Sequence, residues 1–138
     1  MDNTTDISQT PDEFETLIQP EAQLPEIALD DLPAPLKAAV ARAGWPKLMP
    51  VQSKALPYLL EAQDLMVQSR TGSGKTGAFL LPIFHRIDLG LAQTQALILC
   101  PTRELAKQVA MDAEMLFGDT ELKVATVYGG VGYGPQTD

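Results

Sequence analysis

Three short apolar runs alternate along the chain with segments whose apolar residues recur at helical spacing. The runs cover residues 65–67, 96–100 and 124–128, and helical spacing follows the first run through residues 80–87 and the second to about residue 117. Uninterrupted apolar strands separated by amphipathic helices are typical of a parallel sheet that is covered on both faces. The pattern therefore predicts an α/β fold in three layers.

Two more helices are expected before the first apolar run. Leu36 and Val40 suit a short helix that Gly44 can end as the C′ residue. Pro50 is a good first-turn residue for a second helix through residue 60. Pro82 falls inside the helical pattern that follows the first apolar run, so we expect a kink or an early end there.

The N-terminal part of the chain differs from the rest in its charge. The protein has a formal net charge of -8, but residues 1–36 hold nine acidic residues and no Lys or Arg. From Lys37 onward nine acidic and ten basic residues nearly balance. We interpret residues 1–24 as an acidic disordered leader, with an acidic arm that occupies a basic nucleic-acid groove as the alternative.

Length and composition exclude several classes of protein. The 138 residues correspond to one ordinary domain, and 45% of them are hydrophobic, enough for a normal core. A single cysteine, Cys100, excludes a disulfide framework, and with His85 as the sole histidine a Cys/His zinc site is excluded too. Neither a transmembrane run nor a signal peptide is recognisable. The expectation is a soluble cytoplasmic protein with no membrane partner.

Residues 69–76, with the sequence SRTGSGKT, form the strongest chemical motif. They resemble a Walker A loop, although Ser69 stands where the strict pattern has glycine. Gly72 and Gly74 let the backbone curl so that N–H groups face phosphate oxygens, Lys75 supplies a positive charge for the β- and γ-phosphates, and Thr76 can complete a Mg²⁺ shell. The alternative is a chance glycine-rich turn with a surface lysine. The candidate ATP-binding residues of the loop are Ser69, Arg70, Thr71, Gly72, Ser73, Gly74, Lys75 and Thr76.

Four segments together resemble the N-terminal part of a DEAD-box RNA helicase. They are GWPKLMPVQ at 44–52, TGSGKT at 71–76, PTRELA at 101–106 and YGG at 128–130. The resemblance runs from about residue 25 to the end. It implies a Q-motif region at 25–53 and a partial RecA-like P-loop NTPase domain at 54–138, incomplete at the C-terminus.

The resemblance places Gln52 at the position of the adenine-recognising glutamine. A side-chain amide can accept from the adenine 6-amino group and donate to N7, whereas guanine fits that amide badly. The family usually has Phe, Pro and Thr or Ser where this chain has Trp45, Leu48 and Met49, and Ile27 stands where an isolated aromatic is expected. We expect Ile27 to cover the base without stacking, which weakens adenine binding. The alternative is that Gln52 is a solvated helix residue.

The hexad at 101–106 follows the second apolar run, so it should lie at the carboxyl edge of the sheet. Pro101 would end the strand and Thr102 would cap the next helix. The hexad by itself also fits a capped helix start with a surface ion pair, but the resemblance implies contacts of Thr102 and Arg103 with the RNA backbone. Gly129 and Gly130 end the third run and could approach RNA in the same way, or form a simple turn.

The resemblance implies an ATP-dependent RNA helicase that uses ATP and Mg²⁺ and unwinds short duplexes, with Lys75 and Thr76 as catalytic residues. The carboxylate motif Asp-Glu-Ala-Asp and the second RecA-like domain are absent from this sequence, which ends in loop-like residues 131–138. We therefore expect a fragment that is marginally stable and turns over no ATP by itself. A truncated, non-hydrolysing nucleotide- or RNA-binding module and another P-loop enzyme such as a small-molecule kinase are the alternatives, and the hexad argues against the kinase.

Overall fold

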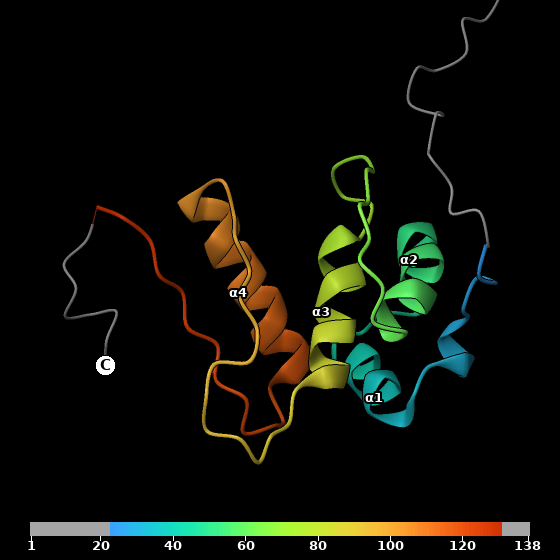
Figure 1. Cartoon of the computed structure of the whole chain (residues 1–138), viewed down its shortest axis with the longest axis horizontal. Coiled ribbons are helices and arrows are strands. Elements are labelled where there is room, and N and C mark those ends of the chain that lie inside the picture. Colours follow the sequence, from blue (N-terminus) through green and yellow to red (C-terminus); the bar gives the residue numbers. More distant parts are fainter. Residues whose placement is uncertain (1–22, 131–138) are drawn as a thin grey trace, which may run out of the picture.

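The computed structural model describes residues 23–130 of the chain. Their regular structure is helical, and the four α-helices lie together as a cluster (Figure 1). In chain order the helices are the 3₁₀ turn η1 (Leu29–Asp31), α1 (Ala34–Arg42), α2 (Pro50–Leu60), α3 (Lys75–Arg86) and α4 (Arg103–Phe117). Of the regions predicted from the sequence, residues 1–22 of the acidic leader and the loop-like residues 131–138 lie outside the described part.

Helix α3 lies at the centre of the cluster, because it packs against each of the other three helices. The buried core between them consists of aliphatic side chains and one phenylalanine. Its members are Leu32, Leu36, Ala39, Val40, Leu48, Leu56, Leu80, Leu81, Val109, Ala113, Leu116 and Phe117. The ring of Phe117 stacks on that of Phe84, with ring centroids 4.8 Å apart, which joins the C-terminal ends of α3 and α4.

Local capping signals set three of the helix ends as predicted. Gly44 has φ of +68° directly after α1, where a left-handed residue favours glycine. Helix α2 begins at Pro50 and ends at Leu60, and α4 is capped by the Thr102 hydroxyl, which accepts from the backbone N–H of Leu105 at 3.2 Å. These predictions are confirmed.

Pro82 does not end α3, so of the two expected outcomes, a kink or an early end, the early end is wrong. The helix continues to Arg86, and the N–H of Ile87 still donates to the carbonyl of Ile83. Proline removes one hydrogen bond of the helix, to the carbonyl of Ala78. Burial of the neighbouring Leu80 and Leu81, which are at most 1% exposed, offsets that loss.

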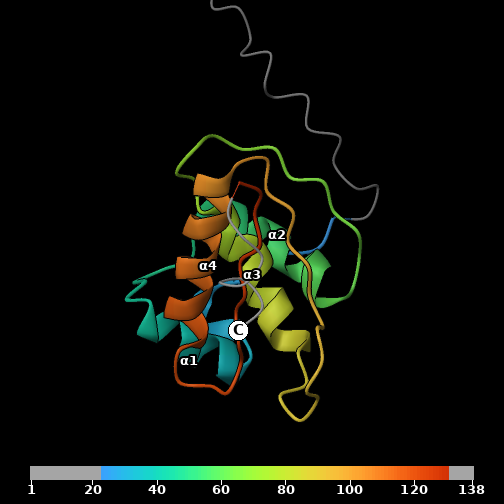
Figure 2. The ribbon, with the colours of Figure 1, turned by 90° about the vertical axis from the view of Figure 1, so that its left-hand side faces the viewer.

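The pairing of the predicted parallel sheet is not confirmed within residues 23–130, where the structure has no regular strand, so the sheet stays a prediction. The three apolar runs instead pass over the outside of the helices (Figure 2). Met66, Leu99 and Val127 are 97%, 85% and 73% exposed. An apolar run indicates that a segment needs to be covered on both faces, but strand formation also needs a paired backbone neighbour. The sequence pattern showed the first requirement and could not test the second.

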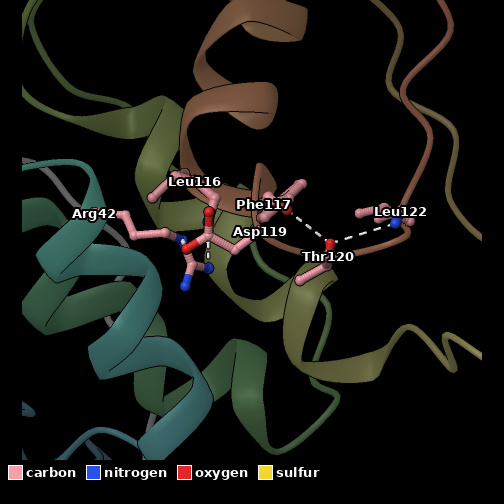
Figure 3. A network of polar contacts seen from close by, with 6 residues as sticks. All are labelled: Arg42, Leu116, Phe117, Asp119, Thr120 and Leu122. Atoms are coloured by element: carbon pink, nitrogen blue, oxygen red, sulfur yellow. Dashed lines mark hydrogen bonds and ion pairs between the residues drawn. The ribbon is translucent and has the colours of Figure 1, made fainter.

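Arg42, at the end of α1, joins that helix to the end of α4 (Figure 3). Its Nη2 donates to the carbonyl of Leu116 at 2.8 Å, and its Nε lies 3.5 Å from a carboxylate oxygen of Asp119. Thr120 closes the same helix end by donating its hydroxyl to the carbonyl of Phe117 at 2.7 Å. The last carbonyls of α4 therefore have side-chain donors.

Replacing Arg42 by leucine should lower the free energy of unfolding by about 1.5 kcal/mol, because a charged hydrogen bond to a helix end is lost. Urea denaturation followed by circular dichroism measures the change. Lys54→Gln is the matched control, since Lys54 lies 3.9 Å from Glu26 in a pair whose side chains are 64% and 60% exposed. The control should change stability by less than about 0.5 kcal/mol. Equal effects of the two substitutions would contradict the assigned role of Arg42.

No helix within residues 23–130 combines the length and the apolar character needed to cross a membrane.

Candidate functional site

Residues 69–74 form a curled loop that leads into the N-terminus of α3. Gly72 and Gly74 have φ of +77° and +90°, in the left-handed region that side chains disfavour. Gly74 is the N-cap residue of α3, so the loop ends at the positive end of the helix. The predicted curl of the backbone around these two glycines is confirmed.

Lys75 folds back over the loop. Its Nζ donates to the carbonyl oxygens of Ser69 and Arg70, at 2.5 and 2.7 Å. The ammonium group therefore lies against Ser69 and Arg70, two residues that a phosphate-binding loop would place around its ligand. An anion that enters the loop can replace these two neutral acceptors with charged oxygens.

The hydroxyl of Ser73 is buried in the loop and has no hydrogen-bond partner among the described residues. Buried polar groups without partners are rare, because desolvation costs free energy that no bond returns. Thr76, three residues further on in the first turn of α3, is partly buried. The loop thus presents an unsatisfied hydroxyl at the position where the sequence predicts bound phosphate.

Gln52 connects α2 to this loop. Its side chain is 2% exposed, its Nε2 donates to the carbonyl of Gly74 at 3.0 Å, and its Oε1 accepts from the backbone N–H of Met49 at 2.9 Å. The alternative of a solvated helix residue is therefore wrong. The orientation of the amide is assigned from these partners, and each of its polar atoms keeps capacity for one more bond.

Ile27 lies beside α2, where its contacts do not include the loop that Gln52 contacts. Its backbone N–H donates to the carbonyl of Ser53 at 3.1 Å, and its side chain packs against the core. It lines a shallow hollow of about 380 Å³ together with Leu24, Pro25 and Pro57, and neither Gln52 nor any residue of 69–76 contributes to that hollow. The structure brings Gln52 to the loop at 69–76, called the phosphate loop below. It does not bring Ile27 into a common cavity with Gln52.

The start of α4 and the glycine pair at 129–130 come together. Nη2 of Arg103 donates to the carbonyl of Gly129 at 3.3 Å, and a Cβ added to Gly130, whose φ is +85°, would lie 3.0 Å from the same nitrogen. The loop at 69–74 and the start of α4 lie at the same end of the helix cluster, the upper end in Figure 1.

Lys107 and Tyr128, which the sequence analysis did not predict as site residues, lie beside Arg103. The Arg103 guanidinium and the Lys107 ammonium lie 5.2 and 5.1 Å from the centre of the Tyr128 ring. Such distances permit cation–π attraction, which holds both cations at one place. The i, i+4 spacing of Arg103 and Lys107 on α4 could have indicated the pair, but nothing in the sequence predicted Tyr128 as their common neighbour.

Trp45 lies between the end of α1 and the first turn of α3. Its backbone N–H donates to the carbonyl of Val40 at 3.1 Å, and its indole lies against Gly77 of α3. The residue therefore contacts the helix that begins at the phosphate loop.

Comparison with known proteins identifies the family. The profile of the DEAD/DEAH box helicases matches residues 49–138, which include the phosphate loop, the start of α4 and the glycine pair. The chain belongs to the DEAD/DEAH box helicase family.

Several helicases of this family are similar in sequence. The chain is 45% identical to the ATP-dependent RNA helicase DbpA of Escherichia coli over 111 residues, which cover 80% of this chain and 24% of DbpA. It is 47% identical to the ATP-dependent RNA helicase CshA of Listeria monocytogenes over 92 residues, or 67% of this chain and 18% of CshA. The chain thus spans about a quarter or less of these two helicases.

Solved structures of helicases share the fold of the described residues. The RNA helicase Prp28 of Chaetomium thermophilum, bound to ADP, superposes with a TM-score of 0.71 at 35% identity over 83% of this chain and 29% of Prp28. A DEAD-box protein of Methanococcus jannaschii superposes with a TM-score of 0.72 at 37% identity, over 80% of this chain and 31% of that protein. The RecA-like assignment therefore agrees with the helicase structures, whereas the pairing of the strands is not seen in residues 23–130.

Proposed function

We propose that this chain is the ATP-binding part of an ATP-dependent RNA helicase that binds single-stranded RNA through its backbone and unwinds short duplexes with ATP hydrolysis. The unsatisfied Ser73 hydroxyl inside a glycine loop at the start of α3 is the observation that carries the proposal. The loop offers this donor, the backbone N–H groups at the helix start and the Lys75 ammonium to one anion. Because the chain belongs to the helicase family, a nucleoside triphosphate is the expected anion.

The residues of the loop fit Mg²⁺ and ATP in their chemistry. Lys75 would exchange the carbonyls of Ser69 and Arg70 for the β- and γ-phosphates, and the Thr76 hydroxyl would face the metal. Arg70, Thr71 and Gly72 would surround the phosphates with backbone N–H groups. Mg·ATP, when bound, supplies the phosphoanhydride whose hydrolysis drives the helicase cycle. The residues of this chain bind and orient it.

Gln52 would discriminate adenine from guanine in this site. Its amide keeps one free N–H and one free lone pair beyond the bonds to Gly74 and Met49, which are the two groups that the adenine edge needs. Because Gln52 is 2% exposed, base binding requires a local shift of α2 or of the segment before it. Ile27 can cover the base only if the same shift brings it toward the loop.

Titration calorimetry with Mg·ATP and Mg·GTP tests the proposed function. We expect Mg·ATP to bind the folded chain at least about tenfold more tightly than Mg·GTP, corresponding to about 1.4 kcal/mol for lost or mismatched hydrogen bonds at the base. Equal affinities would contradict the role of Gln52. ATP binding without RNA-stimulated turnover in a full-length protein would favour the non-hydrolysing module.

Thr102, Arg103, Gly129 and Gly130 would form the RNA-binding end of the domain. The Arg103 guanidinium is fixed between Tyr128 and the carbonyl of Gly129, so its remaining N–H groups point at a defined place. Arg103 and Lys107 are both exposed, as phosphate-binding groups must be. Phosphate contacts of this kind bind RNA regardless of base sequence.

Replacing Lys107 by glutamine should weaken single-stranded RNA binding uniformly across sequences. One phosphate contact fewer lowers the slope of log K against log salt concentration by about 0.7. Fluorescence anisotropy with two unrelated oligonucleotides over a range of salt concentrations measures both quantities. Lys123→Gln is the control, because Lys123 is also an exposed lysine and follows the opposite end of α4. A slope that Lys107→Gln leaves unchanged would contradict the phosphate contact.

A further inference from the structure

Gly77, in the first turns of α3, is a buried glycine against which Trp45 is packed. A Cβ added there would lie 2.4 Å from Cη2 and 2.8 Å from Cζ3 of Trp45, and 2.6 Å from Nε2 of Gln52. Real Cβ atoms essentially never approach other atoms so closely. The indole edge therefore occupies the space that any other residue at position 77 would fill.

The glycine at position 77 has no other explanation in the backbone. Unlike Gly72 and Gly74, it does not have a positive φ, so the helix could accommodate any residue there. Glycine inside a helix costs about 1 kcal/mol relative to alanine. That loss is offset only if the missing side chain allows a contact, and the contacts here are with the six-membered ring of Trp45 and with Nε2 of Gln52.

Two contacts join the start of α3 to α2 and to the segment before it, one at Gly74 and one at Gly77. Gln52 and Met49 lie against Gly74, where an added Cβ would be 2.8 Å from Gln52 Nε2 and 3.0 Å from Met49 Cγ. Trp45 lies against Gly77, about one helical turn further on. Lys75 and Thr76 lie between these two glycines. The backbone N–H of Trp45 donates to the carbonyl of Val40 in α1, which holds the residue in place.

We infer that Trp45 is a positioning residue for nucleotide binding: its indole, matched in size to Gly77, fixes the start of α3 and thereby the phosphate loop. The inference rests on the proposed function, since it assigns a consequence for nucleotide affinity. Trp45 lies against Gly77 and acts through the backbone of α3. The pair 45/77 is then a unit, in which a larger residue at 77 requires a smaller one at 45.

A double-mutant cycle with Gly77→Ala, Trp45→Phe and the double variant tests the pair. Phenylalanine lacks the outer ring of the indole, so it removes the collision of the alanine methyl group with Trp45, whereas the collision with Gln52 Nε2 remains. Gly77→Ala should raise the Kd for Mg·ATP about tenfold, and the double variant should recover about threefold of that loss. Gly90→Ala, a glycine substitution in the loop after α3, is the control and should leave the Kd unchanged.

Trp45 fluorescence provides a second readout, because Trp45 is the only tryptophan of the chain. Gly77→Ala should shift its emission to longer wavelength in the absence of nucleotide, as the indole is displaced toward water. An unchanged Kd and emission in Gly77→Ala would overturn the inference, as would a weakened Kd that Trp45→Phe does not improve. If Gly77→Ala does not fold, a double variant that folds and binds Mg·ATP supports the pair, and one that does neither overturns it. Absence of Mg·ATP binding in the unsubstituted chain would instead refute the proposed function, and this inference with it.

Discussion

Replacing Lys75 by alanine should lower the affinity of the chain for Mg·ATP by about 10- to 150-fold. The substitution removes a charged hydrogen-bond donor from the phosphates, and such bonds contribute about 1.5–3 kcal/mol. It also releases the carbonyls of Ser69 and Arg70, which Lys75 holds at 2.5 and 2.7 Å. Calorimetric titration of Mg·ATP measures the loss. In a full-length protein the RNA-stimulated ATPase should fall with it.

Lys123→Ala is the matched control for this experiment, because Lys123 is an exposed lysine outside the loop. Its affinity for Mg·ATP should equal that of the unsubstituted chain. If Lys75→Ala binds Mg·ATP as tightly as the control does, the phosphate contact of Lys75 does not exist. Intact ATPase activity in a full-length Lys75→Ala protein would contradict the helicase mechanism as a whole.

Replacing Phe117 by alanine should lower the free energy of unfolding by about 3–5 kcal/mol. Phe117 is 3% exposed, and its ring stacks on Phe84 at a centroid distance of 4.8 Å, so the substitution leaves a cavity between α3 and α4. This loss is comparable to the whole stability of a small domain. Urea denaturation followed by circular dichroism should show a transition at much lower urea, or an unfolded chain without urea.

Met111→Ala is the comparison on the same helix. Met111 is 62% exposed, and its substitution should change the stability by no more than about 0.5 kcal/mol. Similar losses for Phe117→Ala and Met111→Ala would mean that the four helices do not share the core described above.

The helix ends and the phosphate loop could be predicted from the sequence because their signals are local. Gly44, Pro50 and Thr102 each end or begin a helix through their own backbone or side chain, and the structure uses them in that way. Gly72 and Gly74 likewise allow positive φ by themselves. The early end expected at Pro82 does not occur because burial of its neighbours, which no local rule includes, decides whether the helix continues.

The contacts that depend on distant parts of the chain could not be predicted. Nothing in the spacing of residues brings Tyr128 to Arg103, or Trp45 to Gly77. The motif placed Gln52 near the nucleotide, but only the structure shows its bond to Gly74. The sheet depends on pairing between separate segments, which the apolar runs alone do not specify, so the predicted sheet stays a prediction.

A crystal structure of the chain with Mg²⁺ and a non-hydrolysable ATP analogue tests the central claim most directly. We predict that the phosphates lie within the loop at 69–76, that Lys75 Nζ leaves the carbonyls of Ser69 and Arg70 for phosphate oxygens, and that the Ser73 hydroxyl acquires a partner. A nucleotide bound elsewhere on the folded chain, with Lys75 still on the two carbonyls, would contradict the account.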